Sequence, residues 1–140
     1  MQIFVRWFLR MSLVWLGVGM LLAVIMAFDP ARAPMLRLAH AHALAAGFVS
    51  MMIFGVAYHV LPRFSGRPLE SARLATVHLW AANLGLVGIV AGWLSAGLLP
   101  GAWTWLHRGG AVAFGLGAAL FIYNIWKTLE APKWNVLQQR

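Results

Sequence analysis

Apolar residues fill four long stretches of this 140-residue chain, and short polar breaks separate the stretches. A helix of about 20 apolar residues is long enough to cross the ~30 Å hydrocarbon core of a bilayer. Residues that end helices stand in the breaks, at Asp29-Pro30, between Pro62 and Pro68, and at Pro100-Gly101. We therefore predict an all-α membrane protein, a single domain over 1–140 built as a four-helix transmembrane bundle, with helices at about 7–28, 36–61, 72–99 and 103–128.

The first stretch also has features of a secretory signal peptide. Arg6 and Arg10 would form its basic region, and Ala31-Arg32-Ala33 resembles a small-residue cleavage site. However, the apolar run over 11–28 is longer than the roughly 7–15 residues of a signal peptide, and Pro34 would follow the cut. We favour a spanning helix.

Basic residues divide unequally between the two sides of such a bundle. Three of them fall on one side (Arg32, Arg37 and Arg108), and eight fall on the other (Arg6, Arg10, Arg63, Arg67, Arg73, Lys127, Lys133 and Arg140). Cytoplasmic loops carry the excess of Lys and Arg, so we predict a bacterial inner-membrane protein with both termini in the cytoplasm. Because the net charge of +8 sits in short gaps between apolar runs, it indicates contact with anionic lipid rather than with nucleic acid.

The composition excludes several kinds of chemistry. Charged residues make up 10% of the chain, far below the ~25% of a soluble domain. There is no cysteine, so disulfides and thiolate-bound metals are excluded. The three acidic residues, Asp29, Glu70 and Glu130, lie in loops or at helix ends, and no nucleophile–base arrangement is present. We expect no independent catalytic activity.

Small residues mark a packing face on the third predicted helix. Gly88, Gly92 and Ala96 recur every four residues, and a face shared with His78 holds Ala82, Gly85, Ile89 and Gly92. Such faces let helices approach closely in lipid. The partner can be another helix of the chain, a second copy in a homodimer, or a respiratory complex.

The five histidines are the best candidates for chemistry, because ionisable or metal-binding side chains are rare within spans. His40, His42 and His107 fall toward the outer side. At 100° per residue, Gly47, Met51, Gly55 and Tyr58 lie on the stripe below His40, and its two glycines predict an open groove suited to a porphyrin. The stripe below His42 carries ordinary apolar residues.

Histidines on two helices at similar depth can ligate haem iron axially. We therefore predict haem b between His40 and His107, with His42 as the alternative ligand. Arg37 and Arg108 stand beside these histidines and can pair with propionates. The alternative is that all three histidines are interfacial and bond to water or to the backbone.

His59 and His78 bracket the basic loop on the inner side. They can form a second site, a quinone contact or a proton relay, or simply be solvated at the interface. Copper is not expected, since the seven methionines do not gather near the histidines.

The second stretch resembles a known family. Arg37-Leu-Ala-His40-Ala-His42 followed by GFVSMMIFGVAYHVLPR, from Gly47 to Arg63, looks like the second helix of haem–copper oxidase subunit I, in the branch of cbb-type cytochrome oxidases and nitric oxide reductases. His78-Leu-Trp80 and Asn83-Leu-Gly85 look like the next helix. The resemblance covers about 35–95 and implies that His40, or else His42, ligates a low-spin haem b near the outer face.

The chain also departs from this family. The family subunit has about three times as many helices, and its copper ligands and its other haem ligand lie on later helices. His107 is therefore a candidate by position only. Two functions remain in view: a small haem b protein in electron transfer or in redox or gas sensing, and a haem-free accessory or assembly subunit of a respiratory oxidase or nitric oxide reductase. A carrier of metal or haem during oxidase maturation is a third.

Overall fold

The computed structural model describes residues 1–96 and 101–130, and within these all regular secondary structure is helical. Four helical segments are long and apolar enough to cross a membrane, as predicted: Ile3–Phe28, Pro30–Ser65, Ala72–Ser95 and Trp103–Glu130. The predicted end of the third helix at 97–99, together with Pro100, Lys133 and Arg140, lies outside the described residues. The chain is thus a multi-pass membrane protein.

The helices are α1 (Ile3–Phe28), α2 (Ala33–His42), α3 (Met51–Ser65), α4 (Ala72–Ser95) and α5 (Ala102–Glu130). A short 3₁₀ turn, η1 (Pro30–Arg32), precedes α2, and a π-helical segment, η2 (Ala43–Ser50), joins α2 to α3 within one continuous span. A π-helix holds an extra residue compared with an α-helix of the same length, and such segments are frequent at functional sites.

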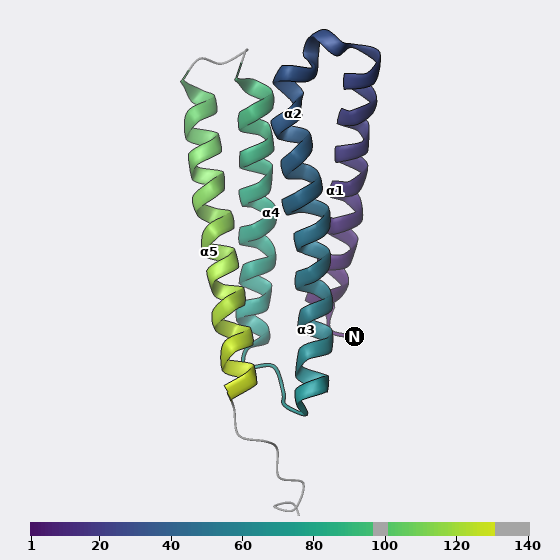
Figure 1. Cartoon of the computed structure of the whole chain (residues 1–140). Helices are drawn as coiled ribbons and strands as arrows, with labels where there is room; N and C mark the ends of the chain where they lie inside the picture. The colour runs from purple at the N-terminus through teal and green to yellow at the C-terminus, as the bar shows by residue number, and fades with distance from the viewer. Residues whose placement is uncertain (97–100, 131–140) are drawn as a thin grey trace, which may run out of the picture.

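Figure 1 shows the spans running side by side, each in the opposite direction to the one before it in the chain. The start of α1, the connection between α3 and α4, and the end of α5 lie at one end, which we call the amino-terminal end. The connection between α1 and α2 and the start of α5 lie at the far end. The assignment of the amino-terminal end to the cytoplasm stays a prediction.

Local signals fix the turn between α3 and α4. Gly66 adopts φ 63°, a left-handed conformation that ends α3 and favours glycine. Ser71 caps α4, because its hydroxyl accepts a hydrogen bond from Leu74 N at 3.2 Å. Asn124 on α5 then binds the backbone of Ser71 on both sides, donating to its O at 2.8 Å and accepting from its N at 3.0 Å. The turn is therefore attached to α5.

The helices α4 and α5 approach backbone to backbone, and the packing face predicted from the small residues of α4 is confirmed. Ala82, Gly85, Ile89 and Gly92 are all buried. A Cβ added at Gly85 would lie 2.7 Å from Gly110 O on α5, and one added at Gly92 would lie 2.8 Å from His107 Cβ. The face therefore serves contacts within the chain, and it brings His107 close to α4.

Candidate functional site

His40, half-buried on α2, faces α1. Its Nδ1 lies 2.9 Å from the carbonyl oxygen of Gly19. A carbonyl oxygen only accepts, so Nδ1 carries the proton and Nε2 keeps its lone pair. Histidine ligands of metals are usually oriented by such a bond on the other ring nitrogen. His40 therefore has the tautomer of a metal ligand, but its ring lies on the side of α2 that faces α1.

The glycine stripe below His40 is filled by α1, so the open groove that it predicted is not present. A Cβ at Gly47 would lie 2.5 Å from Trp15 Cβ, and one at Gly55 would lie 3.0 Å from Phe8 Cβ. Glycines that let helices approach closely are common in membrane bundles. The stripe reflects packing of α1 on the second span and leaves no flat surface for a porphyrin beside Gly47.

At the far end, the side chains of His42 and His107 lie close to each other. Their ring centroids are 6.4 Å apart, with the rings nearly perpendicular at 89°. Trp93 on α4 lies beside both, with its ring 4.7 Å from His107 and 6.5 Å from His42. Two buried polar atoms here, His107 Nδ1 and Trp93 Nε1, have no hydrogen-bond partner among the described residues. The cluster therefore has unused capacity to bind a polar or metal-containing group.

The separation of these two imidazoles suits axial ligation of one iron. Two iron–nitrogen bonds of ~2.0 Å, with about 1 Å from each nitrogen to its ring centre, place the ring centres roughly 6 Å apart. His42 Nδ1 bonds to Leu38 O at 2.8 Å, which leaves its Nε2 lone pair free. The hollow beside His42 measures about 160 Å³ and is lined by Ala41, Ala45 and Ala46. The ring separation therefore agrees with one shared iron, but His107 does not line this hollow, so a macrocycle would extend beyond it onto the surface of the bundle.

The predicted partners of haem propionates are exposed. Arg37 and Arg108 are both exposed, and neither forms an ion pair within 1–96 and 101–130. Across the same residues, no group of three or more His, Asp or Glu side chains is placed to hold a metal ion.

His59 and His78 have different partners, so the inner pair predicted from the sequence does not form a common cluster. His78 is fully buried, and its Nδ1 lies 3.2 Å from the Tyr58 hydroxyl. The rings of Phe54 and Phe8 lie 4.6 and 4.9 Å from it. Its Nε2 has no hydrogen-bond partner among the described residues. The Tyr58 partner and the aromatic surround indicate a structural role for His78 in the core.

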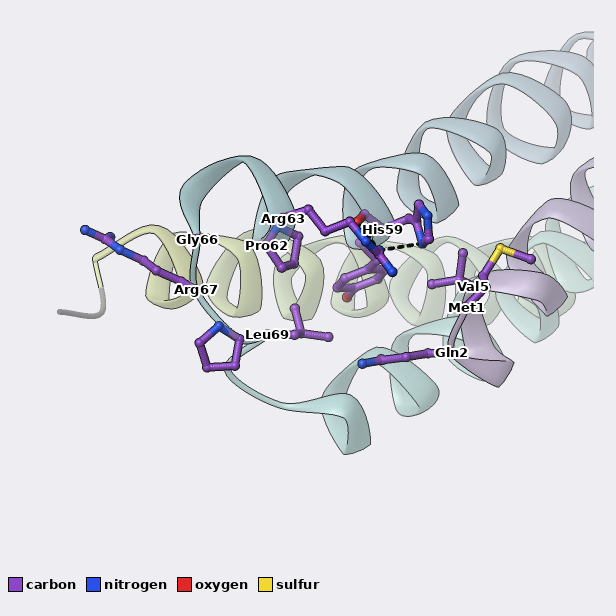
Figure 2. A pocket seen from close by; sticks show the side chains of 11 residues that line it. Met1, Gln2, Val5, His59, Pro62, Arg63, Gly66, Arg67 and Leu69 are labelled. Atoms are coloured by element: carbon purple, nitrogen blue, oxygen red, sulfur yellow. Dashed lines mark hydrogen bonds between the residues drawn. The ribbon is translucent and has the colours of Figure 1, made fainter. Parts of the chain in front are cut away.

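His59 instead lies at the amino-terminal end, where a cavity of about 600 Å³ opens between the start of α1, the end of α3 and the following turn. Arg63 Nη1 lies 2.8 Å from His59 Nδ1 and donates to His59 O at 2.7 Å. Figure 2 shows Arg63 folded back along α3 onto His59.

Two contributors were missed by sequence reasoning. The first is Trp93, which lies in the histidine cluster. Its position directly after Gly92, a residue of the small-residue packing face, indicated that it lies close to another helix. Asn124, a lone amide within an otherwise apolar stretch, is fully buried and binds the α3–α4 turn. A polar residue buried within a span needs a hydrogen-bond partner, so the position of Asn124 in the sequence predicted a contact with another part of the chain.

Comparisons with known proteins confirm the partial resemblance to subunit I of haem–copper oxidases. The cbb3-type cytochrome c oxidase subunit CcoN1 of Stutzerimonas stutzeri is 29% identical, over 67% of this chain and 25% of that protein. Cytochrome c oxidase subunit 1 of Rhodobacter capsulatus is 32% identical, over 67% of this chain and 23% of that protein. The cytochrome c oxidase subunit 1 homolog of Bradyrhizobium diazoefficiens is 27% identical, over 69% and 22%. The chain spans about a quarter of the length of these relatives. No family model and no solved structure matches the chain.

Proposed function

We propose that this chain is a small membrane protein of the respiratory oxidase type that binds haem b at the far end of the bundle, between His42 on α2 and His107 on α5. The observation that carries the proposal is the 6.4 Å separation of these two imidazole rings, which agrees with axial ligation of one iron. When bound, haem would supply one-electron transfer or, with one ligand displaced, gas binding.

The residues of the chain would hold the ligands in place. The Leu38 carbonyl orients His42 by accepting a hydrogen bond from Nδ1, so that Nε2 can bind iron. Gly92 lets α5 approach α4 closely, and this fixes the depth of His107. Arg37 and Arg108 supply exposed guanidinium groups for propionates. The family resemblance favours His40 as the ligand on α2, whereas the geometry favours His42.

A macrocycle held by His42 and His107 would be partly uncovered, since the hollow beside His42 is small. A second copy or a larger respiratory complex would cover it, and both are proposed as partners together with the surrounding lipid. The relatives are named as subunits of cytochrome oxidases, which supports the complex. The excess of basic residues at the amino-terminal end supports placing this end in the cytoplasm of a bacterial inner membrane.

A second function has its own support. Trp15 occupies the surface beside Gly47, so the stripe below the histidine implied by the resemblance is used for helix packing. A haem-free accessory or assembly subunit of an oxidase would retain such a bundle.

Absorption spectra distinguish the two functions and the two ligands. The protein is purified in mild detergent after expression with added haem, and spectra are recorded oxidised and after dithionite. We expect reduced bands typical of haem b in the wild type and in His59→Ala, which changes a histidine at the opposite end. We expect their loss in His42→Ala and in His107→Ala.

Each alternative result has a defined meaning. Loss in His40→Ala with retention in His42→Ala would assign the ligand that the resemblance implies. A colourless wild-type protein would reject haem binding and leave the accessory function.

A further inference from the structure

The cavity at the amino-terminal end is lined by basic side chains. Its walls include Gln2, Tyr58, His59, Arg63, Arg67 and Leu69, and no carboxylate is present among the eleven described residues that line it. The nearest acid in sequence, Glu70, is exposed and lies outside the lining. A cavity of about 600 Å³ falls within the ~300–1,000 Å³ of typical small-molecule sites.

Arg63 is held at this cavity by a neutral partner. Its two hydrogen bonds both go from Nη1 to His59, to the ring Nδ1 and to the backbone oxygen. A guanidinium only donates, so Nδ1 of His59 is unprotonated and contributes no positive charge at that nitrogen. The bonds therefore orient Arg63 without neutralising it, and within 1–96 and 101–130 no ion pair occupies the guanidinium nitrogens other than Nη1.

The other side chains of the cavity complement this charge. Figure 2 shows Gln2, the residue just before α1, reaching toward Leu69, while Arg67 extends from the rim away from the centre. Leu69 and Val5 provide apolar walls. A guanidinium, an amide and apolar walls at the end of a membrane bundle match a phosphate group carried on an amphiphile.

We propose that this cavity binds the phosphate of an anionic phospholipid headgroup, with Arg63 as the principal ligand and His59 as the residue that positions it. Free inorganic phosphate presents the same chemistry, and the experiment below separates the two sources. The proposal does not depend on the haem site, which lies at the opposite end of the bundle.

Native mass spectrometry of the detergent-solubilised protein tests the proposal by titration with phosphatidylglycerol or with zwitterionic phosphatidylcholine. We expect the wild type to bind one phosphatidylglycerol in preference to phosphatidylcholine. Arg63→Gln should weaken this binding about tenfold or more, as expected for loss of charge-assisted hydrogen bonds. The matched control is Arg6→Gln, which removes an exposed charge at the same end but outside the cavity, and should weaken binding at most about fivefold. Arg63→Lys, which keeps the charge but loses the planar fork, should fall between.

Competition with inorganic phosphate identifies the source. Displacement of phosphatidylglycerol by phosphate alone at low millimolar concentration would support the site and assign it to soluble phosphate. Persistence of the lipid would support the headgroup. Equal effects of Arg63→Gln and Arg6→Gln, or no preference for phosphatidylglycerol in the wild type, would overturn the proposal. Far-UV circular dichroism of each variant confirms that the helices are intact.

Discussion

Adding a methyl group at Gly110 should separate α4 from α5, whereas the same change at Gly109 should not. A Cβ at Gly110 would lie 2.5 Å from Gly85 O, 2.6 Å from Ile89 N and 2.8 Å from Gly88 C. All three are backbone atoms of α4, so no side chain can rotate away. A Cβ at Gly109, one residue earlier on the same helix, has no atom within 4 Å.

The magnitude follows from two opposing terms. Alanine is favoured over glycine by roughly 1 kcal/mol within a helix, and this term applies to both variants. Overpacking a tight interface costs about 1–3 kcal/mol, and this term applies to Gly110→Ala alone. The first term cancels in the comparison, so we expect the free energy of unfolding of Gly110→Ala to fall about 1–3 kcal/mol below that of Gly109→Ala.

Unfolding by sodium dodecyl sulfate in mixed micelles measures this difference through the far-UV circular dichroism signal and the fluorescence of the tryptophans. Gly109→Ala should unfold at the wild-type detergent fraction or slightly above it, and Gly110→Ala at a clearly lower fraction than Gly109→Ala. Agreement of the two variants within about 0.5 kcal/mol would refute the backbone contact between α4 and α5.

Two further predictions concern the far end and the turn. Gly92→Ala would place a Cβ 2.9 Å from His107 N, so it should displace His107 and weaken haem binding about tenfold. Haem titration measures this affinity, and an unchanged affinity would argue against His107 as a ligand. Asn124→Leu removes both bonds to Ser71 and leaves Ser71 N without its partner, while Ser71 O keeps its bond from Ala75 N at 3.3 Å; the change should lower the free energy of unfolding by about 1–3 kcal/mol. Thr76→Val is its control, because Thr76 is exposed and bonds only within its own helix, and this change should cost less than about 0.5 kcal/mol. An equal effect of the two changes would show that the turn is not held by α5.

The sequence was sufficient for the spans and for one helix interface, because both depend on the order of residue types along the chain. A long apolar segment without charged residues predicts a membrane-spanning helix whatever the neighbouring helices are. Likewise, the repeat of Gly88 and Gly92 predicts a close contact for α4. It could not say that this contact would be α5, since a row of glycines carries no information about its partner.

The same limit explains the outcome at the glycine stripe. The stripe from His40 through Gly47 does form one face of the second span, but a missing side chain suits a cofactor and a neighbouring helix equally well. Here Trp15 of α1 takes the space. The choice between His40 and His42 was also beyond reach of a helical wheel, because a wheel gives the angle between two residues and not the neighbouring helix that each of them meets.

The π-helical segment makes the number of residues between His42 and Met51 as important as their identity. Because η2 holds one residue more than an α-helix of the same length, deleting one residue within 43–50 would restore a regular α-helix and leave α2 and α3 in the same relative orientation. Deleting a second residue there would turn α2 by about 100° relative to α3, and Ala39 and Ala41 would then take the places of His40 and His42. Such a change would leave the hydropathy of the span almost untouched, yet it would remove both imidazoles from their partners. Loss of two residues from this stretch, but not of one, would thus separate chains able to hold the proposed haem iron at the far end from chains that share only their bundle.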